Sequence, residues 1–526
     1  MPVPEEIRRV KRPVNTIVVD SGSKGLKRYA VRERNGFVYE KGSNPRPRNG
    51  KVVGHIINGR YVPIGEPVVS EEPESLSYGS SAFIKSVSGD ILDDLLDTYD
   101  AGDAFAMLVI AAIRVMKRNP PDSRLGMHYA RTFLNRFFPG VHLSKNTVGA
   151  LLEGLGKAET KRRMFFERRI ARVCKEHHVA IDGMLRQDTS AINDLSAFSR
   201  KARVKGCKDV SILYAYDVEL MEPVCSEVFS GNSIDSSAYA HFIRNNNLSK
   251  GIIVADKGFP ASAIASELQD RPELHYLNPL KRDNRKIEQY GMLAFDHMLR
   301  TKGETVACKK VKARKGLFLY SFRNPRKAEA EEKDYLLRWN KKGDVLDPAD
   351  FARKKERFGT IVFESDLDMP LETVFRCYAE RWQIELVFRS YKNDLLMDRT
   401  RVHGDFSVIG NEEINFISSL ISSRLLRKAD DAGLLEKMSF GDLMEDLSMA
   451  WRKVDAPAVP SSDDGGWTCP VKALFPELEA LGLSKPAAKP EPLKPGRRSL
   501  ARGEFVGPKR PRGRPRKDRS ATDEDV

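Results

Sequence analysis

The sequence contains few cysteines and no long hydrophobic run. Six cysteines are spread over 526 residues, and no two of them form a CxxC motif. We therefore expect inert thiols, and neither a structural zinc knuckle nor a disulfide framework. The longest apolar run, residues 104–113, is far shorter than the roughly 20 residues that cross a bilayer. The chain also begins without the apolar stretch of a signal peptide, so we expect a soluble, cytoplasmic protein with no membrane contact.

What the chain has in abundance is length and positive charge. Hydrophobic residues make up 41% and charged residues 31%, which is enough apolar material for real cores and excludes global disorder. At about 100–200 residues per domain, we expect roughly three to five parts. The chain has 88 Lys and Arg against 73 Asp and Glu, a net charge of +15. This surplus favours a polyanionic partner, most often nucleic acid.

Residues 1–80 have the pattern of a β-rich N-terminal region, which we expect to bind DNA together with the helical region that follows. Short runs of Val and Ile alternate with Gly, Pro and basic residues, and Asn58-Gly59 is a typical hairpin turn. The loop-like segment at residues 20–25 lacks the spacing of a phosphate-binding loop, so we interpret it as a turn.

Residues 81–175 have apolar residues at helical spacing, and we expect a helical, DNA-binding region there. A capped helix is expected at residues 143–155, and the pattern fits a recognition helix as well as an ordinary helix. The acidic residues from Asp90 to Asp103 are more typical of a solvated helix face than of a metal cluster.

Residues 176–405 change character and predict an α/β domain. The predicted order over residues 176–280 is β, β, β, α, β, α, β, which indicates a mixed sheet flanked by helices. The polar residues 281–360 contain strand-like pieces and are interpreted as a β-rich insertion, and a long helix is expected from about 370 to 394. C-terminal helices are expected at 406–455, followed by a linker and a disordered basic tail at 456–526.

Two aspartates are candidate catalytic residues of this domain. Asp182 and Asp256 are each predicted to end an apolar strand. An acid at the carboxyl end of a buried strand points into the crevice where open sheets hold ligands. Strand ends also carry aspartates as turn formers, and either residue alone fits that role better.

A third acid lies on the predicted helix from 370 to 394. Tyr378, Arg381, Glu385 and Lys392 are spaced 3, 4 and 7 apart. At about 100° per residue they share a stripe roughly 60° wide. The alternative is an ordinary surface ladder of ion pairs around Glu385. The neighbouring side of the helix is apolar and should dock on a core; it comprises Cys377, Ile384, Phe388, Tyr391 and Leu395.

Together, the three acids suit a phosphoryl-transfer site with two metal ions. Three carboxylates placed close together repel one another unless cations are bound. Carboxylate oxygens are preferred ligands of Mg²⁺, and two such ions can activate an attacking oxygen and stabilise a leaving one. Tyr378, Arg381 and Lys392 would then contact phosphates of the same DNA strand.

These residues resemble a known family, the DDE transposases of bacterial insertion sequences. The resemblance covers about residues 176–405, and Tyr378-x2-Arg381-x3-Glu385-x6-Lys392 is similar to the Tyr-Arg-Glu-Lys signature of one large group. It implies an RNase H-like fold, with the first Asp on the first strand, the second after the fourth strand and the Glu on a later helix. The β-rich insertion before the Glu would be residues 281–360.

The resemblance also implies an activity. Asp182, Asp256 and Glu385 would be the catalytic residues and would bind two Mg²⁺ ions, with Mn²⁺ as a substitute. The reaction would be DNA strand cleavage and strand transfer at the ends of the element. Double-stranded DNA, as transposon ends and target, would be the partner of a homodimer associated with a prokaryotic nucleoid.

The sequence departs from the family at one point and leaves two assignments open. Residue 184 is Met where many relatives have Thr, which makes Asp188 an alternative for the first acid. Trp339 of the insertion would either stack on a flipped base or serve in packing. Two other functions also fit: a transposase-derived DNA-binding protein without cleavage activity, and an RNase H-like nuclease without strand transfer.

The tail contains a second motif. Residues 511–515, Pro-Arg-Gly-Arg-Pro, match the core of an AT-hook, in which Arg512 and Arg514 would enter a narrow A·T minor groove. Residues 484–526 hold 13 Lys and Arg and 6 Asp and Glu, a net +7. The alternative is a nonspecific basic tail.

Overall fold

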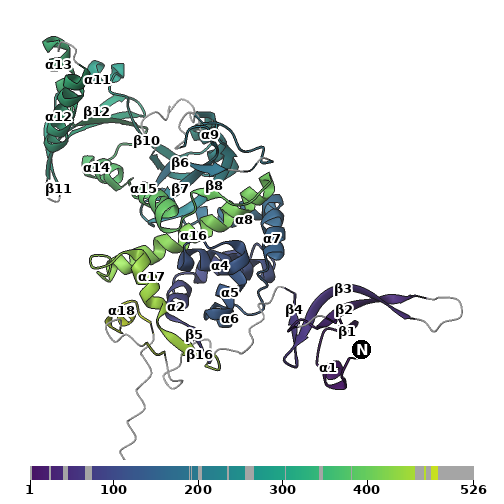
Figure 1. Ribbon diagram of the computed structural model, residues 1–526. Coiled ribbons are helices and arrows are strands. Elements are labelled where there is room, and N and C mark those ends of the chain that lie inside the picture. The colour runs from purple at the N-terminus through teal and green to yellow at the C-terminus, as the bar shows by residue number, and fades with distance from the viewer. Residues whose placement is uncertain are drawn as a thin grey trace, which may run out of the picture. The chain divides into compact units, whose positions relative to one another are not determined.

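The computed structural model contains a large mixed sheet, a group of helices and a small sheet near the N-terminus (Figure 1). The structure describes residues 3–22, 25–38, 46–64, 74–188, 190, 192–199, 204–233, 236–254, 266–301, 304–342, 347–380, 382–456, 467–469 and 475–483. By its internal contacts the chain divides into two units, 1–486 and 487–526, and the second lies outside the described residues. None of the helices in the described ranges is long and apolar enough to cross a membrane.

The N-terminal residues form a four-stranded antiparallel sheet with its own small core. Its elements are α1 (Glu5–Arg9), β1 (Thr16–Asp20), β2 (Tyr29–Val38), β3 (Arg46–Ile57) and β4 (Arg60–Pro63). The strands follow chain order, and Val18, Val31 and Ile56 form the centre of the core. The predicted hairpin turn is confirmed. Asn58 and Gly59 connect β3 to β4 with φ angles of 49° and 74°, which these two residue types adopt readily.

A group of helices follows the N-terminal sheet. It comprises α2 (Gly79–Lys85), α3 (Gly89–Leu96), α4 (Ala101–Lys117), α5 (Asp122–Arg131), α6 (Leu134–Phe137), α7 (Lys145–Lys157) and α8 (Glu159–Ile170). α4 is apolar on most sides and is buried along most of its length. The capped helix predicted at 143–155 is α7, in which the Ser144 hydroxyl accepts a hydrogen bond from the Thr147 N–H at 3.1 Å.

The central sheet is mixed, as predicted. Its first five strands are β6 (His178–Asp188), β7 (Lys208–Asp217), β8 (Glu222–Ser230), β9 (Lys250–Val254) and β10 (Glu273–Pro279), with α9 (Ser236–Asn245) between β8 and β9. They lie in the order β8-β7-β6-β9-β10. β7 is antiparallel to β6 and β8, whereas β6, β9 and β10 are parallel. A short strand, β15 (Arg399–Thr400), also pairs with β6.

The insertion is less β-rich than predicted and continues the central sheet. Its elements are α11 (Arg285–Gln289), β11 (His297–Thr301), β12 (Glu304–Arg314), β13 (Leu317–Arg323), α12 (Pro325–Lys342) and α13 (Pro348–Lys355). β13 pairs with β14 (Thr360–Ser365), which pairs in turn with β10. None of these three helices was predicted; the longest, α12, is so strongly charged that its apolar stripe is short.

The C-terminal part is helical. It comprises α14 (Leu371–Glu380), α15 (Trp382–Arg389), the π-helix η1 (Ser390–Asp394), α16 (Asp405–Asp431) and α17 (Phe440–Ser448). β16 (Trp451–Lys453) pairs with β5 (Ser75–Ser77), and α18 (Phe475–Ala480) follows. α16 is buried over much of its length and packs along α7. Gly156 and Gly410 permit the close approach, because a Cβ on Gly410 would lie 2.0 Å from the Leu152 carbonyl oxygen.

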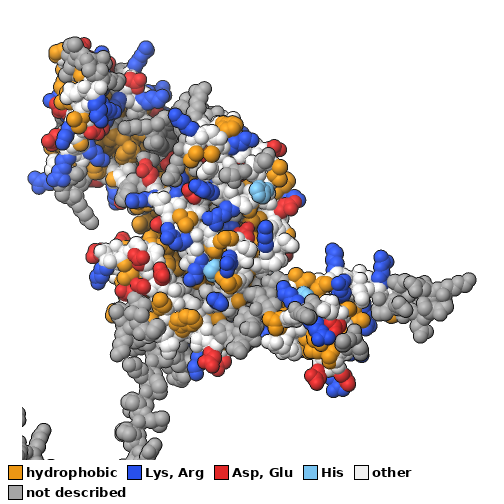
Figure 2. Space-filling model, viewed as in Figure 1, with side chains coloured by type: hydrophobic (Ala, Val, Ile, Leu, Met, Phe, Trp, Pro, Cys, Tyr) orange, Lys and Arg blue, Asp and Glu red, His pale blue; other side chains and the backbone are white. Residues whose placement is uncertain are grey.

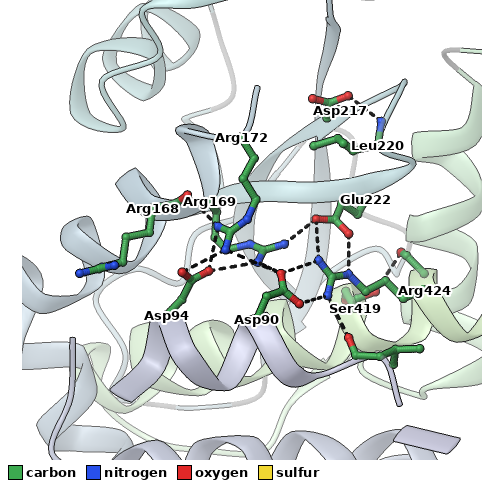
Figure 3. A network of polar contacts seen from close by, with 12 residues as sticks. Asp90, Asp94, Arg168, Arg169, Arg172, Asp217, Leu220, Glu222, Ser419 and Arg424 are labelled. Carbon is green, nitrogen blue, oxygen red and sulfur yellow. Dashed lines mark hydrogen bonds and ion pairs between the residues drawn. The ribbon is translucent and has the colours of Figure 1, made fainter. Parts of the chain in front are cut away.

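A network of ion pairs joins the helical group to the sheet (Figure 3). The buried guanidinium of Arg169 on α8 contacts Asp90 at 2.9 Å and Asp94 at 3.1 Å, and it also contacts Glu222 of β8. Arg424 of α16 binds Glu222 at 2.6 Å and also Asp90. The prediction of a solvated acidic face is therefore wrong for Asp94, which is buried, whereas Asp90 is half-buried and the other acids are exposed as predicted: Asp93, Asp97, Asp100 and Asp103. Burial alone would raise the pKa of Asp90, but hydrogen bonds from Arg424 and Arg169 hold it below its ordinary value.

Candidate active site

Asp182 lies in the middle of β6. The strand continues to Asp188, so the predictions that Asp182 ends a strand or forms a turn are wrong. They failed because Arg186 and Asp188 are polar but buried and paired, which a hydropathy pattern does not indicate. The Asp182 side chain is half-buried, and its Oδ1 accepts a hydrogen bond from the Gly183 N–H at 2.8 Å.

The pairing of β6 with β7 fixes the face of the sheet from which Asp182 projects. Asp182 is directly opposite Tyr214 of β7, and opposed residues project from the same face. The ring of Tyr214 lies 5.8 Å from that of Phe388 on α15 and 6.4 Å from that of Tyr391 on η1. The helical segment that carries Glu385 therefore covers the same face of the sheet as Asp182.

Glu385 is exposed on α15, which contacts β6. The neighbouring side of this segment is buried as predicted, since every residue of the proposed apolar face is less than a tenth exposed: Cys377, Ile384, Phe388, Tyr391 and Leu395. The segment thus docks on the core through the expected side and leaves Glu385 outside it.

The helix from 370 to 394 is not one regular α-helix. The α14 helix ends at Glu380, position 381 lies outside the described residues, and residues 390–394 form a π-helix. A π-helical turn is wider than an α-helical one, so the calculation at 100° per residue does not hold for Lys392. Tyr378 is half-buried, and its ring lies 4.6 Å from that of Phe363 on β14.

Several predicted residues lie outside the described part of the chain. They are Asp256, Arg381, Arg512 and Arg514. For Asp256 the flanking strand is nevertheless described. β9 ends at Val254, which pairs with Ala180 of β6. Asp256 therefore follows Val254 at the same two-residue interval at which Asp182 follows Ala180.

The alternative residues Asp188 and Trp339 both have structural partners. The Asp188 carboxylate accepts hydrogen bonds from the Ser190 N–H at 2.9 Å and the Ser196 hydroxyl at 2.6 Å, and also from Asn193. It thereby closes the turn after β6, which leaves Asp182 as the better candidate. Trp339 stacks on Tyr335 at 6.0 Å within α12, as expected for a packing residue.

A buried carboxylate that the sequence did not single out connects these elements. Glu412 of α16 accepts hydrogen bonds from Tyr391 at 2.7 Å, Tyr214 at 2.8 Å and Arg186 at 3.1 Å. Burial, more than the charge of Glu412, raises the pKa of both tyrosines well above the ordinary value, so both phenols remain donors. Glu412 therefore ties the segment after Glu385 to the strand of Asp182. The one signal in the sequence is a pair of adjacent glutamates between the apolar residues Ile409 and Ile414.

Side chains that offer metal ligands also gather near the start of β6. His178 and Glu219 form a hydrogen bond of 2.7 Å, as do His177 and Asp217. Burial raises the pKa of the Cys377 thiol to about 12, so it is protonated. Within the described residues, two groups could share an ion: His178, Glu219 and Cys377, and His177, Asp217 and Glu219. Neither group contains a residue of the predicted triad, and we interpret the contacts in both as ordinary hydrogen-bonded pairs.

Comparison with known proteins identifies the domain that holds these residues. Residues 173–411 match the family model described as the transposase DDE domain, whereas no curated protein matches the chain. Among solved structures, the chain is similar to a piggyBac transposase synaptic complex with hairpin DNA, at 11% identity, a TM-score of 0.38 and coverage of 71% of this chain and 80% of that chain. It is also similar to a Mos1 transposase paired-end complex with the left transposon end, at 11% identity, a TM-score of 0.14 and coverage of 31% and 56%. On the family match, residues 173–411 form the DDE domain of a transposase, which confirms the predicted enzyme class.

Proposed function

We propose that the chain is the transposase of a bacterial insertion sequence, in the group with the Tyr-Arg-Glu-Lys signature. It cuts DNA at the ends of its element and joins those ends to a target. The observation that carries the proposal is the common face of Asp182 and α15, the helix of Glu385, within a transposase DDE domain. The strand order β8-β7-β6-β9-β10, with Asp182 on the first strand of the domain, supports an RNase H-like fold.

Asp256 completes the proposed catalytic triad. It lies two residues after Val254, the last residue of β9, as Asp182 lies two residues after Ala180, the partner of Val254 on β6. This place after the fourth strand of the domain supports Asp256 as the second acid. The sequence supplies acids at all three positions, as the DDE family requires.

The proposed triad is suited to divalent metal ions that prefer oxygen ligands. Asp182, Asp256 and Glu385 offer only carboxylate oxygens, which suits Mg²⁺, with Mn²⁺ as a substitute. Two bound ions would supply charge stabilisation for the attacking and leaving oxygens of the phosphate. The exposed position of Glu385 keeps its carboxylate accessible to a metal and to DNA.

Double-stranded DNA is the proposed partner, with a homodimer holding two transposon ends. Tyr378, Arg381 and Lys392 would contact phosphates beside the triad, and the ring contact with Phe363 holds Tyr378 in place. Arg512 and Arg514 of the tail would add affinity for A·T-rich sequences through the minor groove. Both solved structures named above are transposase complexes with DNA. Such a protein would be associated with the nucleoid.

Cleavage of a labelled duplex tests this proposal. The duplex carries the DNA that natively borders the gene, and the reaction contains Mg²⁺. We expect cleaved and joined products with the natural protein and a loss of at least 100-fold with Glu385→Gln, because the substitution removes a metal ligand. Glu372→Gln, on an exposed residue of α14, is the matched control and should retain activity. Salt-sensitive binding without any cleavage would indicate a silent DNA-binding protein, and hydrolysed ends without joined products would indicate a nuclease.

A further inference from the structure

Part of the N-terminal sheet consists of only two strands. β1 pairs with β2 as far as Glu33, and β4 pairs with β3 only from Gly54 onward. Residues 34–38 of β2 and 46–53 of β3 therefore lie outside the described pairings with β1 and β4, and residues 34–38 pair with residues 46–49. We call these two stretches the basic ribbon. Figure 1 shows β2 and β3 extending side by side away from β1 and β4.

The basic ribbon carries positive charge and no negative charge. Arg34, Arg48 and Lys51 are exposed, and neither stretch contains Asp or Glu. Arg34 is opposite Asn49, so the Cα atoms of Arg48 and Lys51 lie within about 7 Å of that level along the strands. Lys and Arg side chains stand out from this sheet in Figure 2. Three exposed cations are thus concentrated on the basic ribbon.

The charge of the chain up to the end of the N-terminal sheet has the same sign. Residues 1–64 contain 14 Lys and Arg and 5 Asp and Glu, a net +9 out of +15 for the chain. Phe37 of the basic ribbon is 56% exposed, which gives the ribbon an apolar contact surface beside its cations. A surface with cations and an exposed aromatic ring, and without carboxylates, is complementary to nucleic acid.

We propose that the basic ribbon inserts into the major groove of duplex DNA. The major groove is about 12 Å wide and admits a two-stranded β-ribbon. Arg34, Arg48 and Lys51 contact the phosphates on its walls, and the ribbon positions the transposase on its transposon end. This inference rests on the proposed function. It assigns the first DNA contact to a different part of the chain from the catalytic domain and the tail.

DNA binding by the full-length protein tests the inference. Fluorescence anisotropy is measured with the duplex that borders the gene, at several salt concentrations, for the natural protein and for Arg34→Ala/Lys51→Ala/Arg48→Ala. The control Arg8→Ala/Lys11→Ala/Lys27→Ala removes the same charge from exposed positions outside the basic ribbon. We expect the ribbon variant to bind at least tenfold more weakly with a lower salt slope, and the control to bind within about threefold of the natural protein. Methyl green, a major-groove ligand, should compete with binding by the natural protein and should have less effect on the ribbon variant.

Equal weakening by the two triple variants would overturn the inference, since general electrostatics would then account for binding. Unchanged competition by methyl green in the ribbon variant would also contradict it. Thermal unfolding should be the same for both variants because the replaced side chains are exposed. A different result would contradict the proposed function. If the natural protein binds this duplex but never cleaves it, the transposase activity is contradicted and the inference about the basic ribbon still holds.

Discussion

Two adjacent carboxylates on α16 are both buried, but their surroundings differ. Glu412 is surrounded by donors, with Arg186, Tyr214 and Tyr391 all within hydrogen-bond distance. Glu413 accepts a hydrogen bond from the Tyr99 hydroxyl, and its other oxygen has no hydrogen-bond partner among the described residues. Burial raises the pKa of Glu413 to about 7, against a smaller lowering by Tyr99. Glu412 thus connects β6, β7 and η1 through its hydrogen bonds, whereas Glu413 is protonated below neutral pH.

The raised pKa of Glu413 predicts a pH-dependent stability. In the unfolded chain this carboxyl titrates near its ordinary value of about 4.3, whereas in the folded protein it keeps its proton up to about 7. The folded state therefore binds more protons between these values, and its contribution to stability is lost as pH rises through this window. We expect Glu413→Gln, which cannot ionise, to reduce the loss of unfolding free energy between pH 5 and pH 7.5 by roughly 1–3 kcal/mol.

Urea denaturation at the two pH values measures this effect. Glu445→Gln on α17 is the control, because Glu445 is exposed, and it should keep the pH dependence of the natural protein. An identical pH dependence for the natural protein and Glu413→Gln would show that Glu413 ionises normally in the folded state.

Among the elements, the helices show what a sequence pattern predicts and what it does not. The apolar face around Phe388 was predicted correctly because amphipathic spacing reports burial directly. The π-helix at 390–394 was not predicted, since hydropathy does not distinguish π from α turns. The close contact of α7 with α16 was also not predicted. A hydropathy pattern does not show that glycines such as Gly156 and Gly410 let two helices approach closely.

The contact between α7 and α16 predicts a specific cost of enlarging a glycine. A Cβ at Gly410 would lie 2.0 Å from the backbone oxygen of Leu152, so Gly410→Ala must push the helices apart. We expect a loss of about 1–3 kcal/mol in unfolding free energy by urea denaturation. Gly441→Ala on α17 is the matched control. Its Cβ would meet only the Ser439 hydroxyl at 3.8 Å, so a neutral or stabilising effect is expected. Equal effects of the two substitutions would contradict the close packing.

For the whole molecule, the sequence predicted the mixed sheet and the enzyme class, but not how distant segments meet. Apolar strand runs and the spacing around Glu385 are local signals, and they led to β6–β10 and to the transposase DDE domain. The sharing of Arg169 by Asp90, Asp94 and Glu222 is a tertiary contact between three elements. A single sequence records the charges of such a network but not their proximity. The extension of the central sheet by the insertion was missed for the same reason.

Excision of a marked element in cells tests the central claim most directly. The marker is flanked by the DNA that natively borders the gene, and the natural protein is compared with Asp182→Asn, Asp256→Asn, Glu385→Gln and, as a control, Asp188→Asn. If the first three residues form one catalytic centre, each of those substitutions alone should abolish excision while the protein level is unchanged. Asp188→Asn should retain excision, reduced only as far as the turn after β6 is weakened. Excision at the natural level by any one of the first three variants would contradict the account.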